Sequence, residues 1–334
     1  MLPKNRNVTG TIVSGIVSAA LLIAAAWVII NRQYVSDQIG VWLYKPTPAV
    51  ATIAERSGMA GQGKFYFYAS QPAVNTTDEF NQNCAQQETG SAILGCYSSG
   101  RVYIYDVPNT ELDGVEEVTA AHETLHAVWE RMSDADKKTV GTLLEAAYST
   151  LNDPALNERM AYYERTEPGE RLNELHSILG TEYADVGTDL EAHYKTYFGD
   201  RSKVVALHAS YQAVFDRLKA QATQIETDMT SLKATIDTQT ASYNTQAAAL
   251  SADAAALQTS AASVDRTSAA QVNAYNAKRQ ALLNRIAALE SLRQSINANT
   301  QAYNEKVTAY NALIGSANEL SQSLDSTLVS APSL

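Results

Sequence analysis

The first stretch of the chain is set apart by an unbroken apolar pattern. No charged residue lies between Arg6 and Arg32, and residues 11–30 are an almost continuous run of valine, isoleucine, leucine, alanine and tryptophan. Twenty helical residues span about 30 Å, the thickness of the hydrocarbon core of a bilayer. We therefore expect residues 1–31 to form an N-terminal transmembrane anchor. A cleaved signal peptide is the alternative, although its apolar core is usually shorter, about 7–15 residues.

Residues 32–200 alternate short apolar runs with turn residues, and six of the eight prolines fall here. The aromatic and β-branched runs at 63–69 and 100–106 predict strands. Helix start and stop signals, among them Gly180 as the end of the fourth helix, predict helices over about 113–131, 133–151, 154–163, 170–179 and 189–198. Strands followed by a separate run of helices predict an α+β domain.

Residues 201–334 carry the helical period throughout, with Gly315 and Pro332 as their only glycine and proline. Apolar residues three and four apart form two heptad seams. The Tyr-Asn pairs that begin at Tyr243 and Tyr275 are four residues out of phase with the heptad. A stutter within one helix would cause this shift, but we prefer a chain reversal and predict an antiparallel coiled-coil hairpin. The hairpin is a candidate surface for self-association or partner binding.

Charge is distributed unevenly between the last two stretches. Residues 32–200 carry 26 acidic and 12 basic side chains, whereas residues 201–334 are almost neutral. Phosphate backbones are bound by basic surfaces, so this acidic domain argues against nucleic acid as a partner.

The two cysteines and the charges around the apolar run bear on cellular location. Cys84 and Cys96 flank a short polar loop, a spacing that favours a disulfide in an oxidising compartment; unpaired thiols are the alternative. A small excess of positive charge before the apolar run favours a cytoplasmic N-terminus. We therefore expect a single-pass membrane protein with an extracytoplasmic body.

One motif on the helix expected over 113–131 indicates a chemistry. His122 and His126 are four residues apart, so they project from one helix face and can ligate one metal ion. Glu123 lies beside them, where it can act as a general base toward water activated by Zn²⁺. This is the H-E-x-x-H pattern of zinc metallopeptidases, the zincins. Two surface histidines that bind no metal are the alternative.

A catalytic zinc site needs a third protein ligand, and we predict Glu174. It follows Asn173 on the fourth predicted helix. Here the chain resembles the gluzincin metallopeptidases, over about residues 100–180, in which a glutamate on a helix after H-E-x-x-H completes the site. Other candidates on or near that helix are His176, Glu170, Glu167 and Glu182.

The resemblance implies a membrane-anchored, extracytoplasmic zinc metallopeptidase that hydrolyses peptide bonds of a peptide or protein substrate. The strand at 102–105 is a candidate edge for aligning that substrate, with an interior strand as the alternative. A surface structural or adhesive coiled-coil protein with a degenerate, non-catalytic zincin domain is the second hypothesis. A peptidoglycan hydrolase is a third, suggested by location alone.

Overall fold

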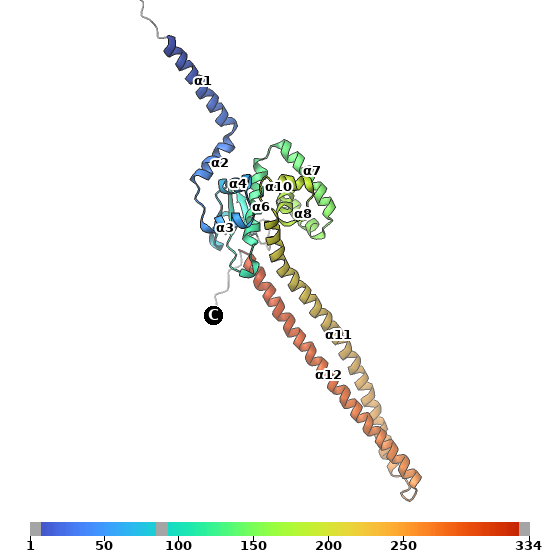
Figure 1. Cartoon of the computed structure of the whole chain (residues 1–334). Helices are drawn as coiled ribbons and strands as arrows, with labels where there is room; N and C mark the ends of the chain where they lie inside the picture. The colour runs from blue at the N-terminus through green and yellow to red at the C-terminus, as the bar shows by residue number, and fades with distance from the viewer. Residues whose placement is uncertain (1–7, 85–92, 327–334) are drawn as a thin grey trace, which may run out of the picture. The chain divides into compact units, whose positions relative to one another are not determined.

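The computed structural model describes residues 8–84 and 93–326 of a mostly helical chain with a small sheet (Figure 1). Its elements in chain order are α1 Val8–Ile30, α2 Arg32–Leu43, α3 Pro48–Arg56, α4 Gly61–Ala69, β1 Ala73–Asn75, α5 Thr77–Asn83, β2 Gly95–Ser98, β3 Arg101–Tyr105, the 3-10 turn η1 Thr110–Leu112, α6 Val115–Arg131, α7 Asp134–Leu151, α8 Pro154–Thr166, α9 Arg171–Glu182, α10 Thr188–Tyr194, α11 Ser202–Ala261 and α12 Ala269–Leu324. Contacts divide the chain into two compact units, one of residues 1–214 with 320–334 and one of residues 215–319.

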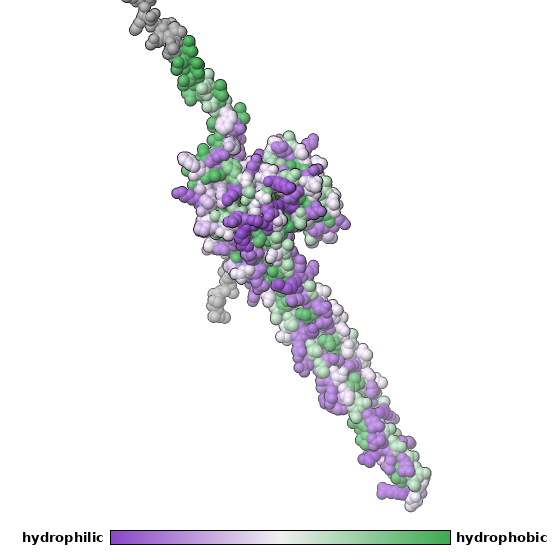
Figure 2. Space-filling view, in the orientation of Figure 1, coloured by the Kyte–Doolittle hydropathy of each residue, from purple (hydrophilic) through white to green (hydrophobic). Residues whose placement is uncertain are grey.

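Helix α1 contains the apolar run that was expected to form the anchor. Residues Ile12–Ile30 have a mean hydropathy of 2.5, and none of this segment is buried within the protein. Figure 2 shows hydrophobic surface along the helix. The helix is therefore long and apolar enough to cross a membrane, a property that signal sequences share.

The sheet has three strands in the order β1-β3-β2. Strand β1 runs parallel to β3, and β2 pairs with β3 in an antiparallel hairpin. Ser99 and Gly100 form the hairpin turn with φ values of 53° and 77°, and positive φ at both positions is what the two-residue type I′ turn requires. Within the part of the chain that the structure describes, β3 is therefore the central strand and β2 an edge. Strand 102–105 is therefore an interior strand, which was the alternative, and not the edge strand that was expected to align a substrate.

Residues 63–69 form helix α4, so the strand predicted there was wrong. Its aromatic residues favour a strand locally, but the buried positions Gly63, Phe67 and Ser70 follow the helical spacing of four and three. A Cβ on Gly63 would lie 2.1 Å from the backbone oxygen of Tyr197, so the helix approaches another segment closely. Tertiary packing overrides the local preference here.

The five predicted helices after the sheet are present as α6 to α10, but three of their ends differ. Helix α8 continues to Thr166, α10 ends at Tyr194 and not near residue 198, and α9 extends past Gly180. Gly180 does not end that helix, which continues to Glu182. A Cβ at Gly180 would lie 2.4 Å from Cδ1 of Leu125 and 2.8 Å from Cε1 of Tyr194. This glycine therefore lets α9 pack closely against α6 inside the core.

The second unit consists of two long helices that lie side by side (Figure 1). The chain reverses between α11 and α12, where Ser268 accepts a hydrogen bond from the backbone N–H of Gln271. A polar seam residue, Gln239, donates to Ser295 and accepts from Asn299 on the opposite helix. Polar positions in the seam are thus satisfied within the hairpin itself.

Both ends of the hairpin sequence belong to the first unit. Val204, in the first turn of α11, is fully buried, and Leu207 lies against Gly114. After α12, Ser326 exchanges hydrogen bonds with Asn81 at 2.6 and 2.7 Å. The division between the two compact units falls within α11, after Val214.

Candidate metal centre

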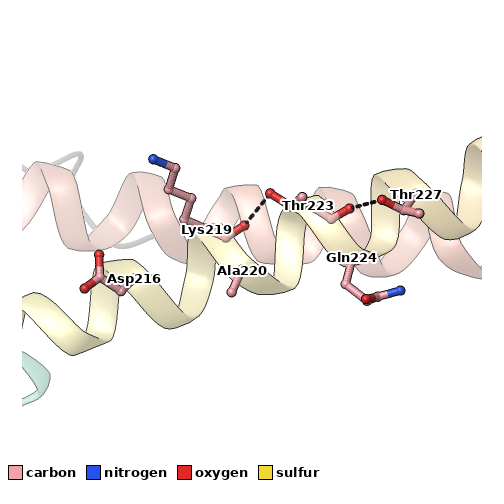
Figure 3. A pocket seen from close by; sticks show the side chains of 6 residues that line it. All are labelled: Asp216, Lys219, Ala220, Thr223, Gln224 and Thr227. Carbon is pink, nitrogen blue, oxygen red and sulfur yellow. Dashed lines mark hydrogen bonds between the residues drawn. The ribbon is translucent and has the colours of Figure 1, made fainter. Parts of the chain in front are cut away.

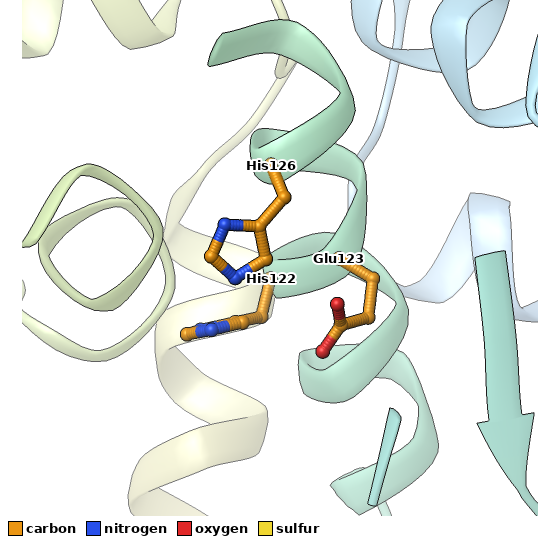
Figure 4. Close-up of side chains that lie close together, drawn as sticks. All are labelled: His122, Glu123 and His126. Carbon is orange, nitrogen blue, oxygen red and sulfur yellow. The ribbon is translucent and has the colours of Figure 1, made fainter. Parts of the chain in front are cut away.

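Helix α6 positions the motif because one of its faces belongs to the core. Val118, Leu125 and Val128 are buried at a helical spacing. On another face, the imidazoles of His122 and His126 lie one turn apart, with ring centroids separated by 4.8 Å. Figure 4 shows both rings on one side of α6 and the Glu123 carboxylate beside them. These three residues form a group that could hold a metal ion.

Helix α9 brings Glu174 to the same point. The two Glu174 carboxylate oxygens lie 3.7 Å from Nε2 of His122 and 3.5 Å from Nε2 of His126. The Glu174 side chain is buried, and its Oε2 atom has no hydrogen-bond partner. A buried carboxylate oxygen without a partner is costly unless a cation or donor satisfies it. Two imidazole nitrogens and one carboxylate converge here, a donor set that suits a metal ion.

Asn173, the residue before Glu174, determines which ring nitrogen of the neutral His126 carries the proton. Asn173 donates from its amide nitrogen to the Glu170 carboxylate at 2.8 Å, so its amide oxygen faces His126. That oxygen lies 2.9 Å from Nδ1 of His126 and can only accept, which makes Nδ1 the donor. Nε2 of the neutral His126 ring therefore carries the lone pair that a metal requires.

The charges of the cluster reinforce one another. Burial opposes ionisation of Glu174, but the imidazoles of His126 and His122 outweigh it and lower the pKa of this carboxyl. Burial likewise opposes protonation of His126, yet the carboxylates of Glu174 and Glu123 raise its pKa. The site therefore attracts positive charge, and a metal ion competes with protons for such a position.

Glu123 lies between the two histidines and the edge strand β2. Burial raises the pKa of Glu123, and the nearby imidazoles of His126 and His122 offset this only in part. The backbone N–H of Tyr97 in β2 also donates to the Glu123 carboxylate. A carboxyl with a raised pKa is better matched to proton transfer near neutral pH than an ordinary one.

Gly95 lets β2 approach this carboxylate, and we expect Gly95→Ala to impair the site. A Cβ there would lie 2.5 Å from Cγ2 of Thr119 and 2.8 Å from Cγ of Glu123. Overpacking of this kind costs about 1–3 kcal/mol of unfolding free energy. Displacement of Glu123 should also lower any Glu123-dependent hydrolysis by about 10²-fold, measured per folded molecule.

Gly100→Ala is the matched control in the same hairpin. Its φ of 77° makes alanine strained, but no atom lies within 4 Å of the added Cβ. It should lower stability without changing hydrolysis per folded molecule. Equal losses of hydrolysis in the two variants would contradict the role given to Gly95.

The other candidates for the third ligand have different partners. His176 hydrogen-bonds through Nε2 to His193 at 2.9 Å and stacks near Trp129 in the core. Glu182 pairs with Arg159, and Glu170 bonds to Asn173. Glu167 is the C-cap of α8, and burial, together with the Glu174 carboxylate, raises its pKa. Only Glu174, among these candidates, faces both Nε2 atoms in the described structure.

Sequence reasoning missed Gly95 and Tyr97, because β2 is too short for its alternation to be recognised. It also gave no role to Tyr163 on α8. Burial and the carboxylates of Glu174 and Glu123 raise the pKa of Tyr163, after allowance for the opposing effect of Arg159. Its phenol is therefore neutral and electrostatically coupled to the site. Its signal in the sequence was a position between the motif and Glu174, which Tyr148 and Tyr162 share.

Figure 3 shows a surface depression on α11 that carries no comparable chemistry. The hydroxyl of Thr223 donates to the backbone oxygen of Lys219, and the hydroxyl of Thr227 donates to the backbone oxygen of Thr223. These hydroxyls are used within their own helix, so we assign no site there.

The convergence of α6, α9 and β2 remains the candidate functional site. No family model, no curated protein and no solved structure matches this chain significantly.

Proposed function

We propose that this protein is a membrane-anchored zinc metallopeptidase whose body lies outside the cytoplasm. The observation that carries the proposal is the convergence of the buried Glu174 carboxylate on Nε2 of both His122 and His126. Two imidazoles and one carboxylate match the protein ligands of catalytic zinc sites of the His₂Glu type. The resemblance to zincins, and to gluzincins in particular, agrees with this ligand set.

Each residue has a defined task in peptide hydrolysis. Zinc, when bound, supplies Lewis acidity that polarises a peptide carbonyl and acidifies water. The Glu123 carboxylate accepts the proton of the attacking water and returns it to the leaving amine. Asn173 holds the His126 ring in the ligating tautomer.

The edge of β2 suits an extended peptide substrate. Strand β2 pairs with β3 along one side, and its residues lie directly against Glu123. An extended peptide can add to such an edge through main-chain hydrogen bonds. We therefore propose β2, and not the strand 102–105 considered from the sequence, as the edge that aligns the substrate.

The proposed location outside the cytoplasm rests on three features. Helix α1 is long and apolar enough to serve as the anchor. The structure bonds Cys84 to Cys96, with Cα atoms 5.8 Å apart, and disulfides persist in oxidising compartments. Residues 85–92, in the loop that this bond closes, lie outside the described residues. The positive charges that precede α1 favour a cytoplasmic N-terminus.

Metal removal tests the proposal on the full chain in detergent or lipid nanodiscs. We expect purified protein to contain stoichiometric zinc and to hydrolyse peptides from an unbiased library. A chelator should abolish both zinc content and hydrolysis, and added zinc should restore them, because the ion supplies the Lewis acid. The chelator's non-chelating isomer is the control.

Two results would overturn the assignment. A metal-free chain that gains no thermal stability from added zinc would show that the cluster does not bind it, since binding to the folded state must stabilise that state. Hydrolysis that persists after complete metal removal would show that another chemistry is responsible.

A further inference from the structure

Helix α2 leaves four large apolar or aromatic side chains exposed, while Val35 and Val41 are half-buried and the Tyr34 ring also lies near Phe65 of α4. Tyr34, Ile39, Trp42 and Leu43 are 51%, 50%, 83% and 67% exposed. The residues that α2 buries against the body are Asp37 and Gly40. An ordinary surface helix has the opposite arrangement, with its apolar side toward the core. We call these four exposed residues the outer face of α2.

Two specific contacts fix this orientation. Arg131, at the end of α6, donates to both carboxylate oxygens of Asp37 at 2.8 and 2.9 Å. On the same side, a Cβ on Gly40 would lie 3.2 Å from the backbone oxygen of Ala69, so α2 packs closely on α4. Rotation of α2 to bury its outer face would break the ion pair and leave two charges unpaired. The outer face therefore stays outward.

Continuity with α1 indicates what covers this face. The apolar window of α1 ends at Ile30, and α2 begins at Arg32. Hydrogen bonds continue through the junction, from Asn31 N–H to the Trp27 oxygen and from Val35 N–H to the Asn31 oxygen. If α1 crosses a bilayer, α2 begins at the bilayer surface.

The composition of the outer face matches that location. Tryptophan and tyrosine concentrate at membrane–water interfaces, where an apolar ring and a polar group each find a suitable environment. We propose that the outer face of α2 rests in the interfacial region of the bilayer that α1 spans, and holds the body against the membrane surface.

Charge selects the kind of lipid surface. The body, residues 32–200, carries 26 acidic and 12 basic side chains, so an anionic bilayer would repel it. The contact should therefore rest on apolar insertion and form on a zwitterionic bilayer without anionic lipid. This proposal does not depend on the peptidase activity.

Fluorescence quenching of Trp42 tests the contact on the full chain in phosphatidylcholine nanodiscs. The chain has three tryptophans, Trp27, Trp42 and Trp129. Trp27→Phe removes the one in α1, and the difference between this variant and Trp27→Phe/Trp42→Phe isolates the emission of Trp42. Because Trp42 is 83% exposed on the protein, the phenylalanine substitution should leave the fold intact.

We expect lipids brominated near the headgroup end of their chains to remove most of the Trp42 emission, and aqueous iodide to have little effect. The same protein in nanodiscs of unbrominated lipid is the control. Strong iodide quenching without bromolipid quenching would overturn the proposal, since the face would then be in water. Protection from both quenchers would overturn it too, because protein, for instance a second copy of the chain, would then cover the face.

Discussion

Glu123→Gln should abolish most peptide hydrolysis while leaving zinc bound. The amide keeps the size of the side chain but cannot accept the proton of the attacking water at neutral pH. General-base catalysis contributes about 10²–10⁴-fold, so we expect kcat to fall by that factor with little change in KM. Zinc content, kcat and KM should be measured on the same preparation, since the proposal requires the metal to stay.

Glu164→Gln is the control for this substitution. Glu164 lies exposed on α8 and contributes no contact to the cluster in the described structure. Its variant should match the wild type in zinc content and kcat. If Glu123→Gln hydrolyses peptides as fast as the wild type, Glu123 is not the general base. Loss of zinc together with activity would instead make Glu123 a metal ligand, as its position between the histidines allows.

Local signals in the sequence were sufficient to predict much of the helical structure. Ser133 accepts from the backbone N–H of Asp136, and Asp153 accepts from those of Ala155 and Leu156, so α7 and α8 begin at the predicted caps. His122 and His126 share a face because the helical period alone puts them there. Glu174 was predicted as the third ligand from the resemblance to gluzincins, because it follows Asn173 on a helix after the motif.

Nonlocal contacts account for what the sequence did not reveal. The run at 63–69 has strand-forming residues, yet it is helical because Gly63 and Phe67 pack into the core. Gly180 looks like a helix end but lies within α9, where Leu125 and Tyr194 leave no space for a Cβ. The position of β2 beside Glu123 depends on its pairing with β3. Although β3 follows β2 after two residues, Glu123 is distant in sequence from β2, as Leu125 is from Gly180 and Tyr197 from Gly63, so local pattern could not report these contacts.

The choice of Glu174 over its neighbours as third metal ligand also depends on nonlocal geometry. Substitution of Glu174 is therefore the prediction with the largest expected effect on metal binding. Glu174→Ala removes the carboxylate whose oxygens lie 3.7 Å from Nε2 of His122 and 3.5 Å from Nε2 of His126. Loss of an outer residue that orients a ligand costs about 10–100-fold in metal affinity, so loss of a ligand should cost more than about 10²-fold. Zinc affinity should be measured by competition with a chromophoric chelator.

Glu170→Ala provides a graded comparison on the neighbouring turn. Glu170 is exposed, and its carboxylate accepts from Asn173, whose amide oxygen faces His126. Its loss should therefore weaken zinc binding by about 10–100-fold, less than the loss of Glu174. His176→Ala should leave the ligands in place, although removal of a core side chain will lower stability. If folded Glu174→Ala keeps full zinc affinity and His176→Ala loses much of it, the third ligand is His176. The convergence of Glu174 on the two histidines, on which the proposed function rests, would then not be the metal site.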